Sequence, residues 1–178
     1  NVLRASYDAG VRRVAVASSN HAADWYEHAL IHGRRMEVLD PHALPLSDNF
    51  YGWAKATYEH MGFLFACGFP GFQDRAGVEH HVSGLSGGRK MGAVMVRIGA
   101  PRELDATRYA SDPGSYKRDL GAYISPRDLT QLFMKAIEAP NIDNEHGIPW
   151  QVVYGISNNT RAFWSLTNAR RVLGYEPE

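Results

Sequence analysis

The chain has little cysteine, no excess of charge of either sign and no long apolar run. Its one cysteine, Cys67, excludes a disulfide framework within these 178 residues and suits a reducing cytoplasm, where we expect the protein to work. Nineteen basic residues balance nineteen acidic ones, which gives no electrostatic case for nucleic acid or an anionic membrane as a partner. No apolar run approaches the ~18 residues of a membrane-spanning helix. We therefore expect a soluble protein that binds small molecules.

Metal-binding patterns are also weak. His28 and His32 are four residues apart on an expected helix, and Glu79, His80 and His81 form a second cluster. Neither pattern places a third ligand, and there is no cysteine pair to add one. We interpret these histidines as surface residues and predict no bound metal.

A tyrosine and a lysine four residues apart, Tyr51 and Lys55, are the strongest chemical signal that is present. Apolar residues predict a helix over residues 51–66, which stacks the two side chains on one face about one turn apart. An ammonium group beside a phenol favours the phenolate, so Tyr51 becomes a candidate general base. The spacing alone is weak, because a surface helix can carry both residues by accident.

A short apolar strand gives the pair its context. Residues 11–17 follow a helix that ends near Gly10, and they lead into Ser18 and Ser19. A nearly all-apolar strand is typical of a parallel sheet that is covered on both faces. Ligands gather beyond the carboxyl ends of such strands, so a serine hydroxyl there can hold the oxygen that loses its proton.

The other expected elements alternate between helix and strand, which predicts an α/β fold. Ser125 and Pro126 are an N-cap and a first helical residue, and they open a helix that runs to about Ala139. We expect the remaining segments as follows: helices at 22–32 and 160–173, strands at 93–98 and 151–154, an irregular lead at 36–49 and a polar substrate loop at 109–121.

In this order the segments resemble the short-chain dehydrogenase/reductase superfamily, in its extended branch of NAD-dependent epimerases and dehydratases. Ala17–His21 is similar to the serine loop of uronate dehydrogenases, and Tyr51–Lys55 matches the catalytic pair. Val96–Gly99 is similar to the strand end near the nicotinamide. Residues 118–125 resemble the substrate-arginine segment, and residues 153–177 resemble the closing strand and helix. The resemblance covers nearly the whole chain.

The resemblance implies a fold and a division of the chain. It implies the C-terminal part of a Rossmann-like doubly wound parallel sheet, with residues 1–98 in the NAD-binding domain and residues 99–178 in a small substrate-binding region. The family's glycine-rich pyrophosphate turn is missing, and Gly84, Gly87 and Gly88 do not replace it because no strand precedes them. We therefore expect the chain to be part of a longer enzyme. The segment Gly68–Gly92 also departs from the family in being longer.

Roles for single residues follow from the same resemblance. Ser19, rather than Ser18, takes the position of the catalytic serine, and Tyr51 takes that of the general base. Lys55 holds the nicotinamide ribose together with Tyr51, and Ile98 lies beside the nicotinamide. The cofactor implied is NAD, with NADP left open.

The sugar-facing residues implied are Ser19, Asn20, His21 and Arg118. Arg118 takes the position that grips a substrate carboxylate, a task suited to a planar guanidinium group. A solvated arginine in a polar loop is the alternative. Dehydratases of this branch carry an acidic pair where this chain has Asn20 and His21, and nucleotide-sugar epimerases have a larger C-terminal region.

The resemblance thus implies an NAD-dependent oxidoreductase that converts C1 of a hexuronate to an aldarolactone. The alternatives are a nucleotide-sugar epimerase or carbonyl reductase, and a non-catalytic protein of the same fold. A homo-oligomer is expected by analogy alone.

Overall fold

The computed structural model of the chain describes residues 2–68 and 89–178. Most of the Gly68–Gly92 segment, with Glu79, His80, His81 and the three glycines named above, lies outside the described residues. The described helices are α1 (Val2–Asp8), α2 (Asp24–Tyr26), α3 (Phe50–Ala66), α5 (Pro113–Ala122) and α6 (Pro126–Glu138). Shorter helical turns are η1 (Asn20–Ala23), η2 (Glu27–Ile31), η4 (Ala106–Tyr109) and η5 (Ala169–Leu173).

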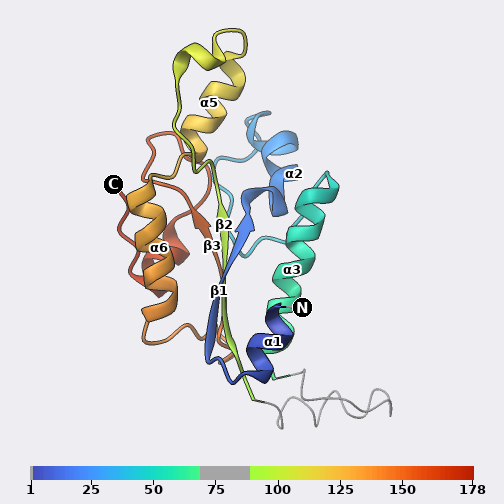
Figure 1. The fold of residues 1–178 in the computed structure, drawn as a ribbon. Coiled ribbons are helices and arrows are strands. Elements are labelled where there is room, and N and C mark those ends of the chain that lie inside the picture. Colours follow the sequence, from blue (N-terminus) through green and yellow to red (C-terminus); the bar gives the residue numbers. More distant parts are fainter. Residues whose placement is uncertain (1, 69–88) are drawn as a thin grey trace.

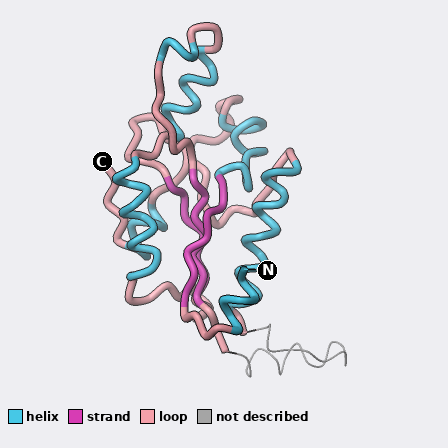
Figure 2. Tube along the Cα trace, viewed as in Figure 1, coloured by secondary structure: helices cyan, strands magenta, loops and turns pink. Residues whose placement is uncertain are grey.

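The centre of the described part is one parallel sheet. Its strands are β1 (Arg13–Ser19), β2 (Gly92–Ile98) and β3 (Trp150–Gly155), in the order β1-β2-β3. The register pairs Ser19 with Ile98 and Ile98 with Gly155, so the carboxyl ends of all three strands meet at one edge (Figure 2). The predicted α/β fold with a parallel sheet is confirmed.

Helices cover both faces of the sheet. Figure 1 shows α1 and α3 on one face, α6 on the other, and α5 beyond the carboxyl ends of the strands. Because side chains alternate along a strand, β2 contributes to both layers of the core. One layer contains Leu3, Val16, Phe65, Ala93, Met95 and Val152. The other contains Val94, Val96, Leu132, Ala136, Val153, Trp164 and Leu173. Among the described helices, none is both long and apolar enough to cross a membrane.

Two expectations from the sequence were wrong. The predicted loop over 109–121 contains helix α5, because the side chain of Asp112 accepts a hydrogen bond from the Ser115 N–H and Pro113 occupies the first turn. The predicted helix over 160–173 is helical only near its end, where η5 lies. Backbone hydrogen bonds from Leu39 N to Phe163 O, 2.7 Å, and from Ser165 N to Leu39 O, 3.0 Å, hold the earlier residues extended.

A buried ion pair joins helix α3 to every strand of the sheet. The carboxylate of Glu59 accepts two hydrogen bonds from Arg97 on β2, Nε to Oε1 at 2.9 Å and Nη2 to Oε2 at 2.7 Å. Both side chains are 1% exposed. Ser18 Oγ on β1 also donates to Glu59 Oε1 at 2.6 Å, and Arg97 Nη1 donates to the Tyr154 hydroxyl on β3 at 3.2 Å.

Burial and the contacts within this network shift the pKa values of Arg97 and Tyr154. Burial lowers the pKa of Arg97, but the hydrogen bonds to Glu59 and the contact with Tyr154 outweigh that effect and raise it above its usual value. Burial raises the pKa of Tyr154 to about 12, so its hydroxyl keeps its hydrogen at neutral pH. The guanidinium group therefore stays charged and depends on Glu59 for compensation.

Replacing Glu59 should destabilise the protein strongly. In Glu59→Gln the charge of Arg97 stays buried without a counter-charge, so we expect the free energy of unfolding in urea to fall by ~3–5 kcal/mol. Glu37 is exposed, and Glu37→Gln is the matched control with an expected change within about 0.5 kcal/mol. A loss below about 1 kcal/mol for Glu59→Gln would show that the pair does not hold α3 to the sheet.

Candidate active site

The serine loop lies at the carboxyl end of β1, where the sequence placed it. The two serines have different partners, because Ser18 Oγ donates to the buried Glu59. Ser19 Oγ accepts from the His21 N–H at 3.3 Å and lies 3.4 Å from Asn20 Oδ1, to which it donates. Ser19 thus caps the turn η1 and, within the described part of the chain, bonds only with the two residues that follow it, whereas the Ser18 hydroxyl is used in the buried network of Glu59.

Tyr51 and Lys55 lie on the first turns of α3. The helix begins where the Asn49 side chain accepts a hydrogen bond from the Gly52 N–H at 2.9 Å. Lys55 Nζ donates to the Ala17 carbonyl on β1 at 3.0 Å and lies 5.6 Å from the centre of the Tyr51 ring. Tyr51 is 56% exposed, so its ring is open to a ligand. The i to i+4 spacing therefore places the cation beside the phenol, with the lysine anchored just before the serines.

Close packing brings the start of α3 against the serine loop. A Cβ atom on Gly52 would lie 1.9 Å from the carbonyl oxygen of His21, so this position excludes any side chain. The His21 ring meets the Tyr51 ring edge to face, with 5.7 Å between ring centres. The structure thus brings His21, Tyr51 and Lys55 together with the end of β1.

The side chains of Asn20 and His21 differ in their hydrogen-bond partners. Asn20 is 2% exposed, and its Nδ2 is a buried donor that has no hydrogen-bond partner among the described residues. A buried donor without an acceptor is costly, so a ligand acceptor would stabilise it. His21 Nδ1 bonds with the buried Asp24 at 2.9 Å, and its side chain is 38% exposed.

Arg118 lies on α5 and is already paired with two carboxylates. Its Nε and Nη2 donate to the two oxygens of Glu27 at 2.8 and 3.2 Å, and its Nη1 donates to Asp119 at 3.2 Å. Burial lowers the pKa of Arg118, but the hydrogen bonds to Glu27 and Asp119 outweigh that effect and raise it. Glu27 follows the serine loop by six residues, so this pair connects α5 to the segment that carries Asn20 and His21.

Ile98 is the last residue of β2 and is half-buried. It pairs in register with Ser19, which places the predicted nicotinamide-side residue next to the predicted catalytic serine at the edge of the sheet.

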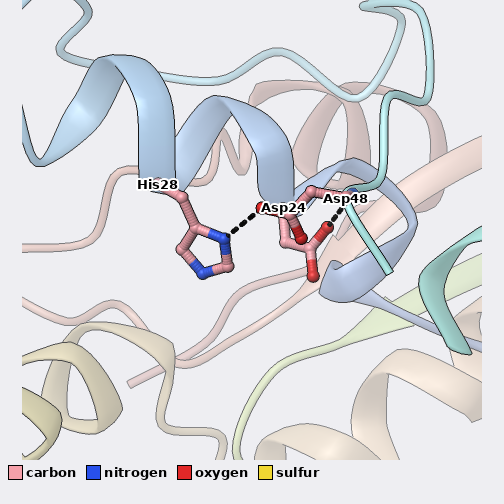
Figure 3. Close-up of side chains that lie close together, drawn as sticks. All are labelled: Asp24, His28 and Asp48. Atoms are coloured by element: carbon pink, nitrogen blue, oxygen red, sulfur yellow. Dashed lines mark hydrogen bonds and ion pairs between the residues drawn. The ribbon is translucent and has the colours of Figure 1, made fainter. Parts of the chain in front are cut away.

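A further cluster contains one of the histidines weighed as a metal ligand. Asp24, His28 and Asp48 lie with ligand atoms within 4.8 Å of one another, and Figure 3 shows the side chains side by side. Hydrogen bonds account for the arrangement: His28 Nδ1 bonds with Asp48 Oδ2 at 2.7 Å, and Asp48 N donates to Asp24 Oδ1 at 3.3 Å. The bond between His28 and Asp48 raises the pKa of the histidine and lowers that of the aspartate. His32, the other histidine of the pattern, has its Nε2 3.6 Å from Glu27.

Sequence reasoning missed the three buried carboxylates that organise this region, Asp24, Glu27 and Glu59. Each is 1% exposed, although acidic residues are rarely buried without a partner. Glu59 lies four residues after Lys55 on the same helix, which is the one local signal that could have suggested a role for it.

The chain is similar to known dehydrogenases in sequence and in fold. No protein-family model matches the chain. The sequence is 32% identical to NAD-dependent glucose-6-phosphate dehydrogenase of Haloferax volcanii, over 98% of this chain and 56% of the relative. It is 28% identical to uronate dehydrogenase of Pseudomonas syringae pv. tomato, over 95% of this chain and 46% of the relative. The chain spans about half the length of the curated relatives that it matches.

A solved structure gives the same result for the fold. Uronate dehydrogenase from Agrobacterium tumefaciens, in a structure complexed with NAD, matches with a TM-score of 0.64 and 21% identity, over 99% of this chain and 51% of the other. This likeness shows a Rossmann-like fold, as the sequence predicted. By sequence, the chain is similar to NAD-dependent glucose-6-phosphate dehydrogenase and to uronate dehydrogenases.

Proposed function

We propose that this chain carries the proton-transfer half of an NAD-dependent oxidoreductase that oxidises a sugar hydroxyl, with Tyr51 as the general base. The observation that supports this most is the placement of Tyr51 and Lys55 against the serine loop at the carboxyl end of β1. The homologues are NAD-dependent sugar dehydrogenases, which fits the same chemistry.

Each residue of the site has a separate role in the proposed reaction. Ser19 Oγ and the free amide hydrogens of Asn20 bind and orient the sugar, while Tyr51 removes the proton from the C1 hydroxyl. Lys55 holds its ammonium group 5.6 Å from the centre of the Tyr51 ring, where it would stabilise the charge that develops as the proton moves. A bound NAD would supply the acceptor for the hydride from C1, and loss of the hydroxyl proton and that hydride together would convert a hexuronate to an aldarolactone.

The residues present fit the nicotinamide side of the cofactor. Tyr51 and Lys55 are accessible beside the end of β1, and Ile98 adds a half-buried apolar side chain at the same sheet edge. A lysine ammonium and a tyrosine hydroxyl suit the hydroxyls of a ribose. We propose NAD as the cofactor, because a relative is an NAD-dependent dehydrogenase and the structure of a neighbour holds NAD.

The substrate that we propose is a hexuronate, because Arg118 offers a planar guanidinium group to its carboxylate. A specific observation also supports a second candidate, an aldose without a carboxylate. Glu27 and Asp119 already neutralise Arg118, so a substrate anion would compete with two buried carboxylates for it. The relatives include the uronate dehydrogenase of Pseudomonas syringae pv. tomato, which fits the first candidate, and the L-arabinose 1-dehydrogenase of Haloferax volcanii, which fits the second.

Removing the phenolic hydroxyl should stop the reaction. In the complete protein, Tyr51→Phe should lower kcat by at least about 100-fold because the general base is lost, while NAD still binds. Tyr58→Phe changes a half-buried tyrosine of the same helix and should leave kcat unchanged. Rates come from NADH absorbance and NAD affinity from fluorescence titration. Unchanged turnover in Tyr51→Phe would defeat the assignment.

The choice of substrate depends on whether Arg118 reaches the sugar. We expect kcat/KM for galacturonate or glucuronate to exceed that for galactose or glucose by about 10- to 100-fold, the effect of a hydrogen bond to a charged group. Arg118→Met should abolish this preference, whereas Arg12→Met, an exposed arginine at the far end of the sheet, should retain it. Equal rates for acid and neutral sugars would favour the second candidate. NADH from none of these sugars would favour an epimerase, a carbonyl reductase or a non-catalytic role.

A further inference from the structure

One buried carboxylate, that of Asp24, touches both segments of the site and has no role in the proton transfer proposed above. It is 1% exposed and lies three residues after the serine loop, at the start of α2. Oδ1 accepts from Ser47 Oγ at 3.0 Å and from Asp48 N at 3.3 Å. Oδ2 accepts from Asn49 Nδ2 at 2.6 Å and bonds with His21 Nδ1 at 2.9 Å. Each oxygen of the carboxylate thus has two partners.

This contact decides which nitrogen of His21 carries the hydrogen. An ionised carboxylate only accepts hydrogen bonds, so the hydrogen of the 2.9 Å contact lies on Nδ1. In the neutral imidazole, Nε2 is then an acceptor. No residue in the described part of the chain bonds to Nε2, and the ring lies edge to face with that of Tyr51. A free acceptor therefore lies beside the proposed general base.

The position of Asp24 is fixed by the segment that leads into α3. Ser47, Asp48 and Asn49 hold its two oxygens from three successive residues, and the Asn49 side chain also caps the helix through Gly52 N. The carboxylate cannot turn to follow a moving ring without giving up these bonds. The helix that carries Tyr51 therefore sets the direction of the His21 ring through Asp24.

We propose that Asp24 is a positioning residue that holds His21 in the Nδ1–H form and aims its Nε2 as a hydrogen-bond acceptor at a sugar hydroxyl. The inference rests on the proposed function, because the sugar is the ligand that Nε2 would meet. Its effect is on orientation and specificity: a hydroxyl that donates to Nε2 is held in place while Tyr51 removes the C1 proton. The competing explanation is that Asp24 merely supports the start of α3 through Asn49.

The tautomer of His21 can be measured without catalysis. Long-range ¹⁵N–¹H NMR of the complete protein, at a pH where His21 is neutral, should show a protonated Nδ1 and a bare Nε2. The signal is assigned by its loss in His21→Gln. A hydrogen on Nε2 would overturn the proposal whatever reaction the protein catalyses. Because this NMR measurement needs no Asp24 variant, it tests the proposal even if Asp24→Asn fails to fold.

Kinetics separate positioning from support of the helix. Asp24→Asn should lower kcat/KM for the preferred sugar by about 10- to 100-fold, but by less than about 2-fold when His21→Gln is already present, since the two residues act as a unit. Asp143→Asn, an exposed aspartate, should change it by less than about 2-fold. Equal losses from Asp24→Asn with and without His21 would overturn the proposal. Absence of NADH with every sugar contradicts the proposed function instead, and the NMR result then tests Asp24 alone.

Discussion

The buried pair of Glu59 and Arg97 is the interaction on which the rest of the structure depends. Two charges that are 1% exposed are stable together only because each satisfies the other with two hydrogen bonds. The pair joins α3 to β2, while Ser18 and Tyr154 extend the same network to β1 and β3. The helix is thereby fixed along the sheet, and its first turns, with Tyr51 and Lys55, come to lie at the carboxyl end of β1.

Ser18 and Ser19 are adjacent at the end of β1, but one belongs to the core and the other to the candidate site. Side chains alternate along a strand, so one of two neighbouring serines faces α3 and the other does not. Ser18 donates to Glu59 and belongs to the core, whereas Ser19 caps the turn that carries Asn20 and His21. Asp24 makes a further connection, because it bonds both with His21 of the loop and with Asn49 at the start of the helix. The site is thus built where one helix is held against the end of one strand by several contacts.

Local signals in the sequence were enough to predict the central elements of the fold, including the strand and the helix that carry the candidate site. The apolar run before Ser18, the spacing of Tyr51 and Lys55 and the cap at Ser125 depend on neighbouring residues, and the structure confirms the elements that they predicted. Glu59 and Glu27 were missed because their partners lie 38 and 91 residues away. Helix α5 was missed because the glycine and proline of this polar segment indicated a loop, whereas Asp112 caps a helix that starts at Pro113. The boundary at residues 98 and 99, the homo-oligomer and the cytoplasmic location stay predictions.

The central claim is that Ser19 and Tyr51 act on one sugar hydroxyl. The most direct test is a crystal structure of the complete protein with NADH and the sugar acid. The account predicts Ser19 Oγ and the Tyr51 hydroxyl both within about 2.6–3.2 Å of the C1 oxygen, with Lys55 on the nicotinamide ribose. A sugar bound away from these residues, or with C1 out of reach of Tyr51, would contradict it.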